Sequence, residues 1–188
     1  MGPEVRQPSV AQDFLQDSLM LFRQYKKLAD GALAQLPNPE RDFFYKPDKE
    51  SNSIAIIMKH MAGNMRSRWR DFLTTDGEKA DRHRDKEFEL ERAEDRAAIM
   101  NLWEEGWACM FAALEPLTAP DMDRIVLIRN QPHSVVQAIN RQLTHYSYHI
   151  GQMVFLAKHI GQENFKSLTV PRGKSEEVNA KMAEKWKK

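Results

Sequence analysis

The sequence lacks several features that mark other classes of protein. Its single cysteine, Cys109, cannot form an internal disulfide, a shortage that is typical of reducing intracellular compartments. No run of 18 consecutive apolar residues is present, and the first ten residues contain no apolar core of a secretory signal. We therefore expect a cytoplasmic protein with no membrane partner.

An excess of charge of either sign is also missing. The 28 lysines and arginines balance 27 acidic residues, which leaves a formal net charge of +1. Nucleic-acid-binding domains usually carry a basic stripe, and the short RSRWR stretch at 66–70 is too small to replace one. We expect no nucleic-acid partner. The length fits one domain over 1–188, with a core over about 10–161 and an extension over 162–188.

Strand-like alternation is scarce, whereas apolar residues recur at spacings of three and four. This pattern predicts long helices over about 10–36, 54–76, 96–114 and 134–160. The short β-branched stretch 124–128 is expected to be an extended loop across one end of the helices. A last amphipathic segment over 176–187 is expected outside the core. The predicted fold is all-α, a four-helix bundle with a short extra C-terminal helix.

The segment over 77–95 has an unusually high density of charged residues. Such a composition indicates either a solvated excursion or the rim of a surface helix. His83 lies in this segment, and we expect its side chain to be solvated.

Three of the six histidines form a pattern that can bind a metal. His145 and His149 are four residues apart, so on a helix both rings project from one side, one turn apart. His60 lies at the margin of the apolar face of the second predicted helix and is half turned toward the interior. Three imidazoles from two facing helices leave at least one coordination position open. The alternative is three unrelated histidines that local hydrogen bonds satisfy.

Carboxylates are absent from both predicted helices that carry these histidines. No Asp or Glu occurs over 54–70 or over 134–161, which excludes a ferritin-like di-iron centre. Tyr146 replaces the general-base Glu of the HExxH metalloprotease motif. What remains is a mononuclear site with neutral ligands. Zinc and nickel fit such a site best, while iron, copper and manganese are further candidates.

A wider set of motifs resembles a known superfamily. The histidine of NSIAIIMKHMAGN and the later HYSYHIGQ resemble the DinB-like superfamily. The resemblance to one bacterial subgroup of unknown function extends over about 10–175, through the stretches SRWRDFLTTDGEK, RHRDKEF, VLIRN, INRQLTHYSYHIGQMV and SLTVPRGKS. It implies that His60, His145 and His149 bind a divalent metal inside a bundle of up-down-down-up connectivity. It also implies a homodimer.

Two classes of function stay open, and the resemblance bears on the first of them. Some superfamily members are thiol-dependent transferases or isomerases, but this subgroup has no assigned reaction. One expectation is a metal-dependent thiol S-transferase or hydrolase that acts on a small molecule and uses a low-molecular-weight thiol. The alternative is a non-catalytic, metal-stabilised bundle that serves as a stress-related binding or dimerisation protein.

Polar residues near the histidine pattern are candidates for substrate binding: Asn64, Arg68, Arg141 and Gln152, with Arg129 as a further cationic candidate. Each also has a structural interpretation, as part of an ion pair or as a hydrogen-bond partner of a neighbouring helix or histidine. Gly151 is expected to permit close helix packing. The sequence indicates no catalytic side chain.

Overall fold

The computed structural model describes residues 9–185. Within this part of the chain the protein is mostly helical, with six α-helices and one small two-stranded sheet. The four long helices are α1 (Val10–Leu33), α3 (Ile54–Trp69), α4 (Arg96–Leu114) and α5 (Val135–Gly161). Two shorter helices are α2 (Pro39–Asp42) and α6 (Ser175–Lys185), and three 3-10 helices are η1 (Arg84–Phe88), η2 (Ala119–Asp123) and η3 (Gln162–Asn164).

Each long helix begins at a side chain that caps it. Ser9, Ser53, Asp95 and Ser134 each accept a hydrogen bond from the backbone N–H three residues later. Such caps satisfy N–H groups that have no partner inside the helix. The caps of α3 and α5 therefore help to define the first residue of each of the two helices that carry the histidines.

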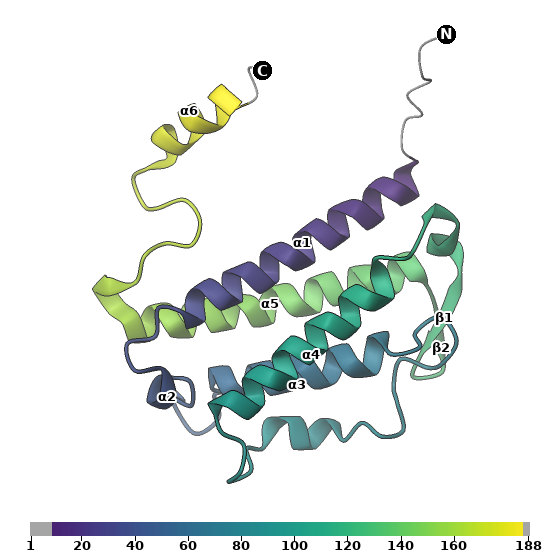
Figure 1. Ribbon diagram of the computed structural model, residues 1–188, viewed down its shortest axis with the longest axis horizontal. Helices are drawn as coiled ribbons and strands as arrows, with labels where there is room; N and C mark the ends of the chain where they lie inside the picture. Colours follow the sequence, from purple (N-terminus) through teal and green to yellow (C-terminus); the bar gives the residue numbers. More distant parts are fainter. Residues whose placement is uncertain (1–8, 186–188) are drawn as a thin grey trace.

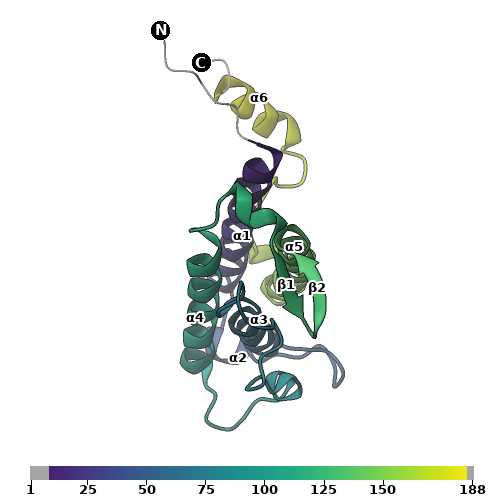
Figure 2. The same ribbon diagram turned by 90° about the vertical axis from the view of Figure 1, so that its right-hand side faces the viewer.

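The four long helices enclose one continuous apolar core. Figures 1 and 2 show α1 beside α5 and α4 beside α3, with α3 flanked by α4 and α5 in the second view. The core includes Phe22, Trp103 and Trp107, all fully buried. A Cβ on Gly106 would lie 3.0 Å from the Cα of Ala62, so the glycine permits the close approach of α4 to α3.

The segment expected to be an extended loop over 124–128 is instead half of a β-hairpin. Strand β1 (Ile125–Ile128) pairs antiparallel with β2 (Gln131–Ser134). Arg129 and Asn130 have φ angles of 57° and 60°, the left-handed pair that a type I′ turn requires. The prediction was wrong because QPHS has no strand pattern and contains a proline. The all-α expectation is corrected accordingly to a mostly helical fold with a small sheet.

Each of the four long helices begins within one residue of its predicted start. The first two helices end earlier than expected, at Leu33 and Trp69, whereas α4 spans 96–114 as predicted. The last predicted helix corresponds to α6, and positions 186–187 of that prediction lie outside the described residues. Figure 1 shows α6 apart from the four long helices. None of the described helices has the length and apolar character needed to cross a membrane.

The charged segment between α3 and α4 is only partly solvated. Its residue His83 is exposed, as predicted. However, Glu87 is 7% exposed, and the side chain of Arg82 is 5% exposed. Burial is possible because η1 packs against α3 and because the two opposite charges contact each other. The expectation of a wholly solvated segment or helix rim was therefore wrong at these two positions.

Candidate metal centre

Three histidines from α3 and α5 meet at one point. One ring nitrogen from each of His60, His145 and His149 lies within 4.8 Å of the other two. The Nε2 atoms of His60 and His145 are 3.3 Å apart. The structure thus brings together the three histidines that the sequence spacing indicated, in a group that can hold a metal ion.

A buried carboxylate determines the tautomer of His60. The Nδ1 atom of His60 lies 2.8 Å from Oε2 of Glu87. Because the carboxylate accepts hydrogen bonds, Nδ1 carries the proton and Nε2 presents its lone pair to the other two histidines. The ring of Phe88 stacks on the same imidazole at a centroid distance of 4.7 Å and covers one of its faces.

Amide side chains orient the two histidines of α5. Nδ1 of His149 lies 2.9 Å from Oε1 of Gln152, and Nδ1 of His145 lies 3.3 Å from Oε1 of Gln142. An amide oxygen also accepts, so both rings present Nε2 as an acceptor. Nε2 of His149 is buried without a hydrogen-bond partner in the described part of the chain. Because a buried polar atom without a partner is costly, this atom favours a bound ligand.

The spacing and donor type fit one small cation. Two nitrogens that each lie about 2.0–2.1 Å from a tetrahedral metal are separated by about 3.3–3.4 Å. The distance between Nε2 of His60 and Nε2 of His145 is 3.3 Å. Two neutral acceptors at this distance repel each other unless a proton or cation lies between them. The His60–His145 pair therefore has the separation expected of two ligands to one ion, and a ring nitrogen of His149 lies within 4.8 Å of both.

The two α5 histidines are neutral at physiological pH. Burial, followed by the nearby rings of His149 and His60, lowers the pKa of His145 to about 3. Burial also lowers the pKa of His149 to about 4, against the opposing effect of its hydrogen bond with Gln152. Only the neutral imidazole binds a metal. Both rings can therefore accept a cation at neutral pH without first losing a proton.

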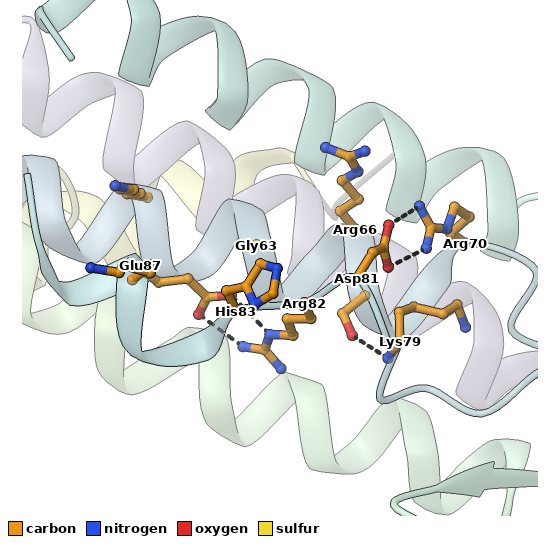
Figure 3. Close-up of a pocket in the computed structure, with 11 residues that line it drawn as sticks. Gly63, Arg66, Arg70, Lys79, Asp81, Arg82, His83 and Glu87 are labelled. Carbon is orange, nitrogen blue, oxygen red and sulfur yellow. Dashed lines mark hydrogen bonds and ion pairs between the residues drawn. The ribbon is translucent and has the colours of Figure 1, made fainter. Parts of the chain in front are cut away.

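A second charged residue holds the carboxylate partner of His60. Arg82 donates from Nε to Oε1 of Glu87 at 2.8 Å and from Nη2 to Oε2 at 2.9 Å (Figure 3). Burial alone raises the pKa of Glu87, but the bonds from His60 and Arg82 outweigh burial and hold it below its usual value. Gly63 on α3 makes room for this carboxylate, since a Cβ there would lie 2.7 Å from Cδ of Glu87.

Sequence reasoning missed both members of this ion pair. Glu87 lies 27 residues beyond His60, and both Glu87 and Arg82 occur in the segment that was expected to be solvated. The one signal that pointed to them was the RHRDKEF stretch, which formed part of the superfamily resemblance. That signal indicated a shared motif but no contact with a histidine.

A cavity of about 510 Å³ opens over the three histidines. Its lining contains all three rings together with polar groups such as Asn64 and Gln142. No Asp or Glu belongs to this lining in the described range 9–185. A volume of this size admits a small molecule to the histidines.

Two of the predicted substrate-binding residues already have protein partners. Asn64, which lines the cavity, accepts a hydrogen bond from the hydroxyl of Tyr146 at 3.0 Å. Arg68 donates to the backbone carbonyl of Gly77 and, at 3.0 Å, to Oε2 of Glu78. These contacts place both residues in the framework of the cavity. A direct role of either residue in substrate binding stays a prediction.

The other two predicted substrate-binding residues, Arg141 and Gln152, differ in whether they line the cavity. Arg141 is exposed, lines the cavity and forms no ion pair with the residues that the structure describes. Gln152 lies outside this lining and instead contacts His149. The neighbouring Gly151 has no atom within 4 Å of an added Cβ in the described structure, so the expectation of close helix packing there was wrong. Arg129 lines the cavity and contacts Glu78.

Comparison with known proteins gives a family but no activity. A family model described as "Protein of unknown function (DUF1572)" matches residues 9–174. No curated protein and no solved structure matches the chain. The matched range includes all three histidines and the Arg82–Glu87 ion pair. The geometry of the three histidines and their cavity is therefore the main guide to the activity of the protein.

Proposed function

The chain belongs to the family described as "Protein of unknown function (DUF1572)", and from this premise we propose that it binds one divalent metal ion through His60, His145 and His149. The observation that carries the proposal is the convergence of one ring nitrogen from each histidine within 4.8 Å of the others, together with the buried Nε2 of His149, which has no partner within the described structure. Glu87 and the two glutamine amides hold the Nδ1 atoms, so each ring has its lone pair available for the ion.

The ligand chemistry narrows the choice of metal. Three neutral imidazole nitrogens suit zinc or nickel best, with iron or manganese as the next candidates. On the motif resemblance, we also place the chain in the DinB-like superfamily. This assignment adds the up-down-down-up bundle, a single domain and a homodimer to the proposal.

The cavity over the histidines gives a small molecule access to a bound ion, and this access favours an enzymatic role. When bound, a divalent ion supplies Lewis acidity that activates a water or thiol nucleophile. The chain's own residues hold and orient the ion, and the cavity of about 510 Å³ gives a small electrophile access to it. We therefore propose a metal-dependent thiol S-transferase or hydrolase, with a low-molecular-weight thiol as cosubstrate in the first case.

A second candidate is a non-catalytic, metal-stabilised bundle. One specific observation favours it: the ligands come from two different helices, α3 and α5, so one ion links them. Such an ion stabilises the folded state because the unfolded chain offers no assembled site. In this alternative the protein acts as a stress-related binding or dimerisation module.

The proposal is tested by elemental analysis of untagged protein after reconstitution with zinc or nickel. We expect about one equivalent in the wild type and almost none in His149→Ala, because a three-ligand site loses one of its donors. The matched control is His159→Ala, an exposed histidine on the same helix. Absence of metal from the wild type, or equal loading of wild type and His149→Ala, would overturn the proposal.

Cobalt substitution distinguishes the enzyme from the structural bundle. In the enzyme an added thiol enters an open coordination position, so the visible absorption spectrum of the cobalt protein changes. An unchanged spectrum, together with a metal-dependent rise in melting temperature, supports the non-catalytic alternative and removes the main support for a thiol transferase.

A further inference from the structure

The cavity over the histidines concentrates positive charge in a protein that is nearly neutral overall. The whole chain has a formal net charge of +1. Five arginines from separate parts of the fold nevertheless line this one cavity: Arg68, Arg82, Arg84, Arg129 and Arg141. Because the described lining holds no carboxylate, the arginine-lined part of the cavity favours an anionic group on a small molecule.

Three of these arginines have buried or half-buried carboxylate partners. Arg68 and Arg129 donate to the same oxygen of Glu78, at 3.0 and 2.9 Å. Arg82 forms a two-bond contact with Glu87. Much of the charge on these three side chains is therefore balanced by the protein itself.

The remaining two arginines are available to a ligand. Arg141 forms no ion pair with the residues that the structure describes. Arg84 has one carboxylate contact, at 3.5 Å to Asp85, whose side chain is 96% exposed, and such a surface pair contributes little. The guanidinium of Arg84 also lies over the ring of Phe88, 5.0 Å from its centroid.

Both available arginines lie near one aromatic side chain beside the histidines. Arg84 and Arg141 line the same cavity as Tyr148. The ring of Tyr148 lies 5.4 Å from that of His145 and 4.2 Å from that of His149, centroid to centroid. The two arginines therefore line the cavity that also contains Tyr148 and the candidate metal centre.

We propose that Arg84 and Arg141 together bind the anionic group, a carboxylate or a phosphate, of a small molecule in this cavity. A guanidinium offers paired N–H donors that match the oxygens of either group. The molecule then extends past Tyr148 toward the histidines. This proposal rests on the proposed function for the contact at the metal centre, whereas the anion site consists of protein groups alone.

A neighbouring cavity also has many basic residues in its lining but, unlike the cavity over the histidines, includes carboxylates. The cavity of about 230 Å³ in Figure 3 is lined by several basic residues but also by Asp81 and Glu87. Arg70 there donates two hydrogen bonds to Asp81, at 2.7 and 3.0 Å. Two carboxylates thus belong to this lining, whereas none belongs to the described lining of the cavity over the histidines, so we assign no anion site to the cavity of Figure 3.

The test measures binding of inorganic phosphate and of malonate by isothermal titration calorimetry, first with protein freed of metal by a chelator. We expect the wild type to bind at least one of these anions. The variant Arg84→Gln/Arg141→Gln should bind it at least about tenfold more weakly, because charge-assisted hydrogen bonds are lost. The control variant Arg92→Gln, an exposed arginine outside the cavity, should bind like the wild type.

Each outcome separates this proposal from the proposed function. Failure of metal-free wild type to bind either anion, or equal binding by wild type and the double variant, overturns the anion site. Anion binding that needs the metal and ignores both arginines also overturns it, while the metal centre stands. Arginine-dependent binding in a protein that takes up no metal supports the anion site and rejects the metal centre. Preference for phosphate or malonate identifies the anionic group.

Discussion

The two sides of the candidate metal centre hold their histidines by different means. On α3, His60 contacts the carboxylate of Glu87, which Arg82 holds through two further hydrogen bonds. On α5, His145 and His149 contact neutral glutamine amides. The α3 side is thus a buried charged network, whereas the α5 side carries no formal charge at neutral pH.

This difference assigns separate tasks to the two helices. A carboxylate partner makes an imidazole more basic and adds a negative charge close to a bound cation. An amide partner orients the ring, but it offers no negative charge to balance a protonated imidazole. The low pKa values of both α5 histidines agree with this absence of a balancing charge. The α3 side therefore supplies charge compensation, and the α5 side supplies two neutral donors that are available over a wide range of pH.

Removal of the side chains that hold the histidines should have the largest effect on metal binding. We expect Glu87→Gln to weaken metal binding about 100-fold and Gln152→Leu about tenfold, since partners of metal ligands contribute within this range and the charged one contributes more. Affinities are measured by competition with a chelator. Glu87→Gln should also lower the free energy of unfolding by about 3 kcal/mol, because buried Arg82 loses its charged partner.

The control for this pair is Glu89→Gln, which removes an exposed carboxylate from the same segment. Its metal affinity should equal that of the wild type. Equal losses in Glu87→Gln and Gln152→Leu would show that the charge on the α3 side has no special effect.

Acid titration of the metal-free protein should separate the two sides by pH. A histidine in the unfolded chain titrates near pH 6.5, while His145 and His149 have folded pKa values of about 3 and about 4. As pH falls below 6.5 the unfolded state binds more protons, so the free energy of unfolding decreases by about 2 kcal/mol per pH unit. Because the pKa of Glu87 is depressed in the folded protein, a second loss follows as the pH falls below about 4.5, where a glutamate in the unfolded chain takes up its proton.

Urea denaturation at pH 7, 6, 5 and 4 in the presence of a chelator measures these losses. The variant His145→Gln/His149→Gln should lack the first loss, and Glu87→Gln should lack the second. A double variant whose stability falls between pH 6.5 and 5 as steeply as that of the wild type would contradict the assignment of the first loss to α5.

Two glycine-to-alanine substitutions, one on each helix, test the same difference between α3 and α5 with the smallest change in chemistry. In Gly63→Ala the new methyl group displaces the carboxylate of Glu87, whose Cδ lies 2.7 Å from the Cβ position. We expect metal affinity to fall about tenfold, as for loss of a ligand's partner. In Gly151→Ala the methyl group meets no described atom within 4 Å, so affinity should not change.

Both glycines lie inside helices, where alanine by itself is stabilising by roughly 0.5–1 kcal/mol. Gly151→Ala should show this gain in the free energy of unfolding, which makes it the reference for the helix effect alone. If Gly63→Ala retained full metal affinity, the carboxylate of Glu87 would have alternative positions that support His60 equally well.

Local features of the sequence were sufficient to predict most helices and the three histidines. Capping side chains, apolar periodicity and the four-residue spacing of His145 and His149 act within one or two helical turns. For the same reason the shared face of these two rings follows from helix geometry alone. The hairpin escaped prediction because pairing with β1 gives QPHS its strand conformation, and no local pattern records that pairing.

What the sequence determined by itself is therefore the position of each donor along a helix. The superfamily resemblance already implied that the three histidines meet, but only the folded chain showed that Glu87 contacts His60 and that Arg84 and Arg141 line the same cavity. The physical reason is that a charged side chain becomes buried only where distant segments supply its partner. In a segment as rich in charge as 77–95, composition cannot identify which residues those will be.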